Sequence, residues 1–255
     1  MSAHPPMPLL VRATRFGLAQ AERPFRWLSG LLLGRAVPWL KGAYLTLRYV
    51  DTYREFPAIR MTRGAQLRIR KEPGAQIHLA THLRVEFQAG RQAGSSITLQ
   101  RNARLEVGGP FHIGEDVRIL VARRGLLEVE GGGPGPHGEP SYSGMMGHVI
   151  VQVKQHVRIG QDTGLSWHSE VMDSDWHPVD GRLVAQPVDI GRHVWVAPGT
   201  YILKGARIGD DCIVASKSTV LAGAYPPRSF LAGTPAKVLG PAPTWRYEWH
   251  ETDYA

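Results

Sequence analysis

The feature that most constrains the fold is a six-residue repeat in the C-terminal half of the chain. From Ile190 the sequence reads as six successive hexapeptides, IGRHVW, VAPGTY, ILKGAR, IGDDCI, VASKST and VLAGAY, and four more begin at Val153 in their own register. Each repeat begins with an aliphatic residue, and small residues recur four positions later. This period fits neither a helix nor a simple strand alternation. It is typical of a solenoid of short strands, three to a coil, whose stacked coils bury a continuous core.

The repeat predicts a mainly β domain over residues 57–240, because looser pieces of the same pattern continue upstream to about that point. It leaves an N-terminal basic, helical segment, 1–56, and a C-terminal tail, 241–255. Two stretches break the repeat and predict loops that leave the coils, 131–147 and 176–189. The first is too rich in glycine and proline to form a coil.

The composition agrees with a turn-rich β architecture. Gly 29 and Pro 19 are too many for a helical bundle, and 43% hydrophobic residues exclude overall disorder. Glycines at the second position of the repeat are expected to serve turns with unusual backbone angles. The single cysteine, Cys212, excludes an intrachain disulfide and suits a reducing compartment. It stands in an inward position, where a small core residue is expected.

The net charge of +8 is concentrated near the N-terminus. Residues 1–50 contain seven basic residues and one acid, which gives +6 for this segment alone. No nucleic-acid-binding motif accompanies these charges, so we expect no nucleic-acid partner. The longest apolar run, 27–34, is too short to span a bilayer. Two interpretations remain open: helices packed on the following domain, or a basic element on an anionic membrane surface.

The repeats, together with the ending FLAGTPAKVL, resemble the hexapeptide-repeat acyltransferases, which fold as left-handed parallel β-helices. DSDWHP, a short linker and then IGRHVW are most similar to the enzymes that O-acetylate capsular, lipopolysaccharide or sialic-acid-containing glycans. The resemblance is strong over 150–240, weak over 57–150 and absent from the first fifty residues. It implies an O-acetyltransferase that uses acetyl-CoA and no metal. It also implies a homotrimer with active sites between subunits. We expect the protein in the cytoplasm, either free or peripheral on the inner face of the cytoplasmic membrane.

Acyl transfer to a sugar hydroxyl needs a base, and a histidine is the usual choice near neutral pH. His177 lies where the repeat breaks, after Asp173 and Asp175. In an extended segment these alternate residues share one face, so either carboxylate, or a backbone carbonyl, could orient the imidazole. Asp175 occupies an inward position, which would require a partner, whereas Asp173 could face the cleft. The resemblance gives His177 the role of general base.

The resemblance also implies where acetyl-CoA lies. Trp195 matches a tryptophan beside the acyl donor, and an outward tryptophan on a rigid coil suggests a stacking surface. His168, one turn before His177, is a candidate contact to the acceptor. Basic side chains are suited to the phosphates of coenzyme A. The other candidate donor contacts are Ala197, Ala215, Ser216, Lys217 and Lys237.

Two alternatives stand beside the acyltransferase. A β-helix can serve as a binding scaffold without catalysis, although a scaffold does not require DSDWHP and Trp195 together. A zinc enzyme of the carbonic anhydrase type needs three histidines, two of them close in sequence. Here His168 and His177 are nine residues apart, without a closely spaced pair in the coils. Acetyl transfer by the purified protein separates these classes.

Overall fold

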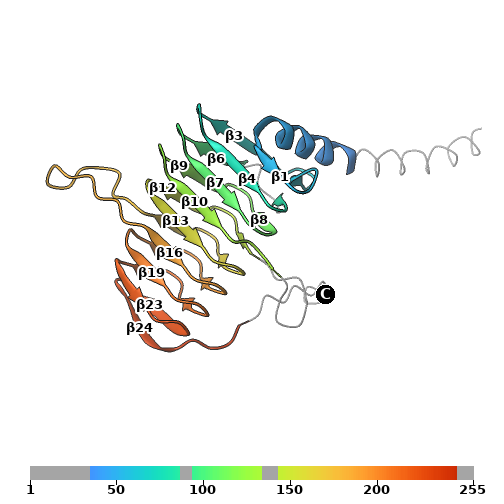
Figure 1. The fold of residues 1–255 in the computed structure, drawn as a ribbon. Helices are drawn as coiled ribbons and strands as arrows, with labels where there is room; N and C mark the ends of the chain where they lie inside the picture. The colour runs from blue at the N-terminus through green and yellow to red at the C-terminus, as the bar shows by residue number, and fades with distance from the viewer. Residues whose placement is uncertain (1–34, 87–93, 134–142, 246–255) are drawn as a thin grey trace, which may run out of the picture.

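The structure is a computed structural model that describes residues 35–86, 94–133 and 143–245 (Figure 1). The described strands wind into one β-helix, in which each strand pairs in parallel with the strand three further along the chain. Three sheets, here named A, B and C, therefore run along the solenoid, and every coil visits them in that order. The predicted fold class, a left-handed parallel β-helix with a short helical segment before it, is confirmed.

The three sheets contain all the described strands. Sheet A consists of β1 (Thr52–Tyr53), β4 (Gln76–Leu79), β7 (Arg104–Val107), β10 (Leu126–Val129), β13 (His156–Ile159), β16 (Val188–Ile190), β19 (Ala206–Ile208) and β22 (Gly223–Tyr225). Sheet B consists of β2 (Ile59–Met61), β5 (Leu83–Val85), β8 (Phe111–Ile113), β11 (Gly144–Met145), β14 (Gly164–Leu165), β17 (Trp195–Val196), β20 (Ile213–Val214), β23 (Ser229–Gly233) and β24 (Ala236–Pro241). Sheet C consists of β3 (Leu67–Lys71), β6 (Ser95–Leu99), β9 (Arg118–Val121), β12 (Ile150–Val153), β15 (Glu170–Met172), β18 (Tyr201–Ile202) and β21 (Thr219–Val220).

The aliphatic first positions of the repeat form the core. All ten are buried, with at most 3% of the side chain exposed: Val153, Ile159, Leu165, Val171, Ile190, Val196, Ile202, Ile208, Val214 and Val220. Cys212 is also fully buried, as its inward position predicts. The fifth position of the last repeat does not follow this rule, because Ala224 occupies it and is exposed. The final coil is one residue shorter than the coil before it, since Ile190 pairs with Ile208 but Ile208 pairs with Tyr225. Tyr225 therefore packs on the core instead.

The turns of the coils use the fourth position of the repeat. Backbone φ is positive at this position in eight hexapeptides, which the sequence interpretation did not single out: Asp162, His168, His193, Gly199, Gly205, Asp211, Lys217 and Gly223. The left-handed region is costly for most side chains and is tolerated best by glycine, asparagine and aspartate. The fourth position therefore has the same backbone conformation in each of these eight turns, whichever residue occupies it.

The glycines at the second position of the repeat were expected to adopt unusual backbone angles, but the structure gives another reason for them. Gly160 and Gly191 do not have positive φ. A β-carbon on Gly160 would lie 2.5 Å from the backbone carbon of Gly191, and one on Gly191 would lie 2.7 Å from the backbone nitrogen of Asp210. These glycines are required because the backbone of the neighbouring coil leaves no room for a β-carbon, not because their φ is positive.

Three predicted boundaries differ from the structure. The first strand of sheet A, β1, lies before residue 57, so the β-helix begins within the segment assigned to the N-terminus. The loop expected at 131–147 ends earlier, because β11 already belongs to sheet B. The excursion expected at 176–189 begins after β15 and ends before β16, so it comprises residues 173–187. It leaves the solenoid at the corner between sheets C and A and projects from it (Figure 1).

Each end of the solenoid has a distinct closing element. A helix over residues 35–49 covers the first coil, and its Leu45 joins the core (Figure 1). The buried Thr46 hydroxyl accepts a hydrogen bond from the backbone N–H of Ile59 at 2.9 Å. At the other end β24 pairs antiparallel with β23. Residues 1–34 and 246–255, which belong to the predicted N-terminal segment and tail, lie outside the described residues.

Candidate active site

The excursion 173–187 is anchored at its base by Asp173. This carboxylate is fully buried and accepts backbone hydrogen bonds from the turn 154–156 of the preceding coil. Its Oδ1 accepts from Lys154 at 2.6 Å, and its Oδ2 accepts from Gln155 and His156 at 2.7 and 2.8 Å. Burial raises the pKa of Asp173, while these N–H groups act in the opposite direction. Asp173 does not face a cleft, because both oxygens fix the root of the excursion to the solenoid.

The excursion is a narrow hairpin. Its two arms form isolated antiparallel bridges, Ser174 with Ala185 and Val179 with Arg182. The tip contains Asp180 and Gly181, both with positive φ, as a tight turn requires. The root closes where the N–H of Gln186 donates to the Asp173 carbonyl at 2.9 Å. The segment is therefore a built projection that carries its side chains out from the corner of the coil.

His177 lies on the outgoing arm of this hairpin, and its side chain is exposed. The residue before it, Trp176, has a φ of 61°, and the ammonium of Lys154 lies 5.8 Å from the centre of its indole ring. Such backbone angles in a bulky residue require support from the surrounding structure, and they occur often at functional sites. Trp176 therefore defines the direction in which the arm presents His177.

The other described histidines are all engaged. Each contacts a named partner: His78 Thr52, His82 Glu55, His112 Glu86, His148 Asp116, His156 Glu128, His168 the His148 ring, and His193 Asp211. Among the histidines in the described part of the chain, His177 alone has no hydrogen bond, ion pair or ring contact. Its imidazole is available to a substrate.

Asp175 lies on the same arm and forms an ion pair with Lys204 of the next coil. It is not in the core, contrary to its predicted inward position, because the chain has already left the coil at Asp173. Asp175 and Lys204 border an open cleft of about 630 Å³ beneath the hairpin, together with Val179 and Arg182. Within the described structure neither Asp173 nor Asp175 contacts His177, so the excursion brings the three residues to one corner without a direct pair.

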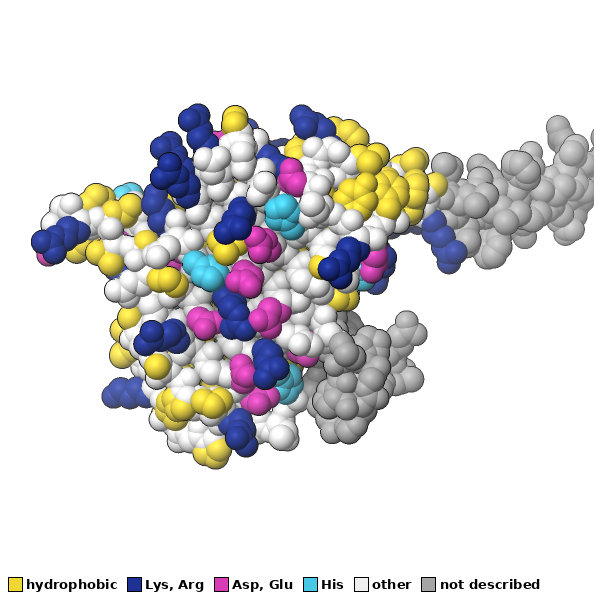
Figure 2. Space-filling model, in the orientation of Figure 1, with side chains coloured by type: hydrophobic (Ala, Val, Ile, Leu, Met, Phe, Trp, Pro, Cys, Tyr) yellow, Lys and Arg dark blue, Asp and Glu magenta, His cyan; other side chains and the backbone are white. Residues whose placement is uncertain are grey.

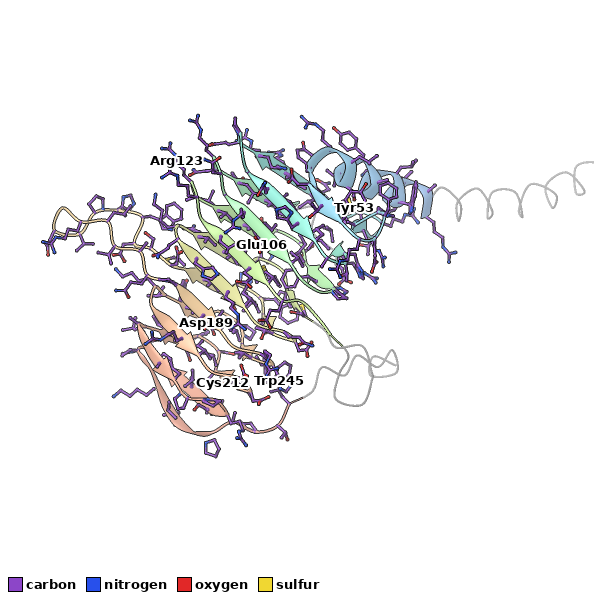
Figure 3. All side chains as sticks on the ribbon, in the orientation of Figure 1. Tyr53, Glu106, Arg123, Asp189, Cys212 and Trp245 are labelled. Atoms are coloured by element: carbon purple, nitrogen blue, oxygen red, sulfur yellow. The ribbon has the colours of Figure 1, made fainter. Side chains whose placement is uncertain are left out.

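Trp195 lies elsewhere, in β17 of sheet B, with 38% of its side chain exposed. Its indole N–H donates to Ser166 Oγ at 3.1 Å, and its ring centre lies 6.1 Å from that of Trp245. Trp245 itself stacks on His193 at 4.4 Å (Figure 3). The Trp195 indole is thus held in a fixed orientation on the face of sheet B.

The predicted donor contacts gather at the corner between sheets B and C. Ala197 and Ala215 occupy equivalent places in successive coils, and their N–H groups donate to Val214 and Leu231 of the following coils. Those backbone donors are therefore used within the solenoid. Lys217 is exposed at the same corner, where its carbonyl accepts from the Thr234 hydroxyl at 3.3 Å. Ser216 and Lys237 are exposed as well.

His168 lies at the same corner, two coils before Lys217. Its ring stacks on that of His148, with centres 4.7 Å apart and planes 3° apart. His148 Nδ1 in turn lies 3.0 Å from a carboxylate oxygen of Asp116. His148 and Asp116 were not identified from the sequence. The available signal was their fourth position in looser repeats, which places them directly in line with His168.

The repeats of the C-terminal coils match a known protein family. A family model described as "Bacterial transferase hexapeptide (six repeats)" matches residues 187–222. The chain carries transferase hexapeptide repeats. These repeats contain Trp195, Lys204 and Lys217, whereas His177 lies on the excursion that immediately precedes them. The candidate site therefore combines residues of the matched repeats with a residue of the excursion 173–187.

Proteins similar to the hexapeptide-repeat chain have related names. One is "Putative lipopolysaccharide biosynthesis O-acetyl transferase WbbJ" of Escherichia coli K12, 33% identical over 36% of this chain and 54% of its own length. Another is "Probable acetyltransferase Rv3034c" of Mycobacterium tuberculosis, 28% identical over 54% of this chain and 44% of its own. The chain thus spans about half the length of these curated relatives.

The solved structures that resemble the hexapeptide-repeat chain include two polysialic acid O-acetyltransferases. OatWY is 21% identical with a TM-score of 0.44, and the match covers 80% of this chain and 96% of OatWY. NeuO is 19% identical with a TM-score of 0.46, and the match covers 73% of this chain and 85% of NeuO.

In the described part of the chain, no group of three or more His, Cys, Asp or Glu side chains is placed to hold a metal ion.

Proposed function

We propose that the protein is an O-acetyltransferase that moves an acetyl group from acetyl-CoA to a hydroxyl of a sugar or surface polysaccharide. The observation that carries this proposal is His177, which is the uncommitted histidine of the described structure and lies exposed on an anchored hairpin. Transferase hexapeptide repeats follow directly, and relatives named as acetyltransferases support the reaction class.

In the proposed reaction His177 is the general base. Its imidazole accepts the proton of the sugar hydroxyl as the hydroxyl oxygen attacks the thioester carbonyl. The carbon–sulfur bond then breaks, and the imidazolium returns a proton to the departing coenzyme A thiolate. We assign Asp173 to positioning, because it fixes the root of the hairpin. Asp175 is the acid nearest in sequence to the base and shapes the adjoining cleft with Lys204.

We place acetyl-CoA beside the Trp195 indole. The pantetheine arm would pass Ala197, Ala215 and Ser216 at the corner between sheets B and C. Lys217 and Lys237, both exposed, would meet the phosphates. In one chain Trp195 lies on sheet B, the face opposite the corner between sheets C and A that carries His177. We therefore propose a homotrimer in which His177 of one subunit faces the donor surface of its neighbour.

The acceptor is proposed to be a glycan. One relative is named for lipopolysaccharide biosynthesis, which is consistent with a sugar acceptor. His168 is the candidate acceptor contact, since its stacked ring lies at the donor-side corner. We propose that the reaction takes place in the cytoplasm.

The test is acetyl-CoA consumption by the full-length protein with a panel of sugars and glycan precursors. His177→Ala should lower the rate by about 10²–10⁴-fold, which is the usual effect of losing a general base. The matched control is His78→Ala, a half-buried histidine on a distant coil, whose contacts are with Thr52 and Gln76. Equal activity of His177→Ala and wild type would refute the assignment of the base. Binding of a glycan without any thioester cleavage would instead favour the scaffold.

A further inference from the structure

The helix over 35–49 is apolar on two opposite sides. Its inner side is buried against the first coil and includes Ala43, Leu45 and Thr46. A β-carbon on Gly42 would lie 2.2 Å from the carbonyl oxygen of Ile59, so the helix backbone lies directly on the solenoid. This contact buries the inner side of the helix. The outer side has no packing partner in the described structure.

The outer helix face consists of Val37, Leu40, Tyr44 and Leu47. Their spacing of three and four residues places them on one stripe of the helix. They are 45%, 58%, 62% and 69% exposed, respectively. The same region appears as a continuous apolar cluster in the space-filling view (Figure 2). Scattered exposed leucines need no explanation, but a contiguous stripe marks an interaction surface.

Aromatic residues extend this apolar surface beside the helix. Trp39 is 51% exposed and packs edge-on against Phe56 at 6.1 Å between ring centres. Tyr53 lies 6.0 Å from Phe56 (Figure 3). An open groove of about 530 Å³ runs along Trp39 and Phe56. Tryptophan and tyrosine are the residues preferred at the boundary between lipid and water.

Positive charges border both the helix face and the groove. Lys41 and Arg48 lie four residues after Val37 and Tyr44, so they follow one edge of the outer helix face. Neither forms an ion pair with a described carboxylate. Arg35 and Arg63 line the groove. The nearby acids are already used, because Asp51 pairs with Lys71 and Glu55 pairs with Arg60.

We propose that the outer helix face docks on an anionic lipid surface. An apolar stripe with cations along its edge fits the boundary of a bilayer that carries negative headgroups. A second copy of the chain is a poorer occupant, because two such faces would bring the same unpaired cations together. Within the described residues no helix is both long and apolar enough to cross a bilayer.

The test is sedimentation of the full-length protein with vesicles of phosphatidylcholine alone or mixed with phosphatidylglycerol. We expect binding only to the mixed vesicles, and weaker binding at high salt. Leu40→Glu with Leu47→Glu should lower partitioning at least about ten-fold. Lys41→Ala with Arg48→Ala should lower it about five-fold for each cation removed. The matched controls are Leu239→Glu, 65% exposed in β24, and Arg123→Ala, on a turn of another coil (Figure 3). Both controls should bind as the wild type does.

Three results would overturn the proposal. These are no binding of the wild type to the mixed vesicles, equal binding to both kinds of vesicle, or undiminished binding of the Leu40 and Leu47 double variant. Light scattering on the same variants tests the competing occupant. Loss of an oligomer, without vesicle binding by the wild type, would assign the face to a second copy. Circular dichroism should be unchanged in all variants because the altered side chains are exposed. Acetyl transfer to a soluble sugar is measured separately, so each proposal can fail without the other.

Discussion

His177 and Trp195 lie on opposite sides of the same β-helix. His177 is carried by the hairpin at the corner between sheets C and A, and Trp195 stands on sheet B, which forms the face across from that corner. A single chain therefore does not bring the proposed base and the proposed donor surface together. If both serve one reaction, each active site must use residues of two copies.

This separation predicts complementation between inactive variants. His177→Ala and Trp195→Ala should each be strongly impaired when prepared alone. When the two variants are mixed and reassembled into trimers, about a quarter of the subunit interfaces should combine an intact His177 with an intact Trp195. Acetyl-CoA consumption should then return to about that fraction of wild type. In the control, the variant that carries both His177→Ala and Trp195→Ala is mixed with His78→Ala. Only interfaces between two His78→Ala subunits should then be active. No recovery in the first mixture would place both residues in one subunit's site or outside it.

The second prediction concerns the anchor of the hairpin. Asp173→Ala removes the acceptor of three backbone N–H groups, and each buried group left unsatisfied costs about 1–3 kcal/mol. We expect the free energy of unfolding to fall by at least about 3 kcal/mol in urea titration. Asp175→Asn is the matched comparison, since this carboxylate is partly exposed and should contribute at most about 1 kcal/mol. Similar losses for the two variants would contradict the assigned roles.

The third prediction tests the left-handed turn position. Arg124 has a φ of 63° and is the fourth residue of a repeat that begins at Val121, and its side chain is exposed. Arg124→Gly should leave stability unchanged or raise it slightly, because glycine adopts this backbone angle without strain. Arg124→Val should lower the melting temperature and cost about 1–2 kcal/mol. If valine were tolerated as well as glycine, the turn geometry would not be a constraint.

The fourth prediction concerns the single cysteine. Burial raises the pKa of the Cys212 thiol above its ordinary value, and its sulfur lies 3.2 Å from the Pro226 carbonyl oxygen. The native protein should therefore react with a thiol reagent far more slowly than the urea-unfolded chain. Because the folded pKa is raised, the contribution of Cys212 to stability is complete below the ordinary thiol pKa. It is lost as pH rises through the higher folded value. Equal labelling rates for the folded and unfolded protein would show that the thiol is accessible.

The sequence could predict the core because the aliphatic residue that begins each hexapeptide points into the solenoid and is buried there. Val196 and Val214, for example, pair at the same place in neighbouring coils. The position of Asp173 was not predictable in the same way, since the hexapeptide frame continues past the residue at which the chain leaves the coil. The carboxylate is recognised as an anchor only when the turn at Gln155 is seen beside it.

The histidine stack shows a second limit. His148 and His168 meet because one coil separates them, and that offset depends on where the preceding loop returns to sheet B. Residue spacing does not reveal it while the loop boundary is uncertain. The fourth-position rule was available from the sequence, since aspartate and glycine recur there at Asp162, Gly199 and Asp211. Histidine and lysine at that position concealed the pattern.

The reversed direction of β24 ends sheet B with an antiparallel strand. A coil that ended in parallel strands would offer unpaired backbone groups on which another molecule could continue the winding, as in a growing fibre. On sheet B that edge is occupied by a strand running the opposite way, and at the other end the helix over 35–49 lies across the first coil. Within the described residues, the last strand of sheet B therefore offers no parallel edge on which a second copy could extend that sheet.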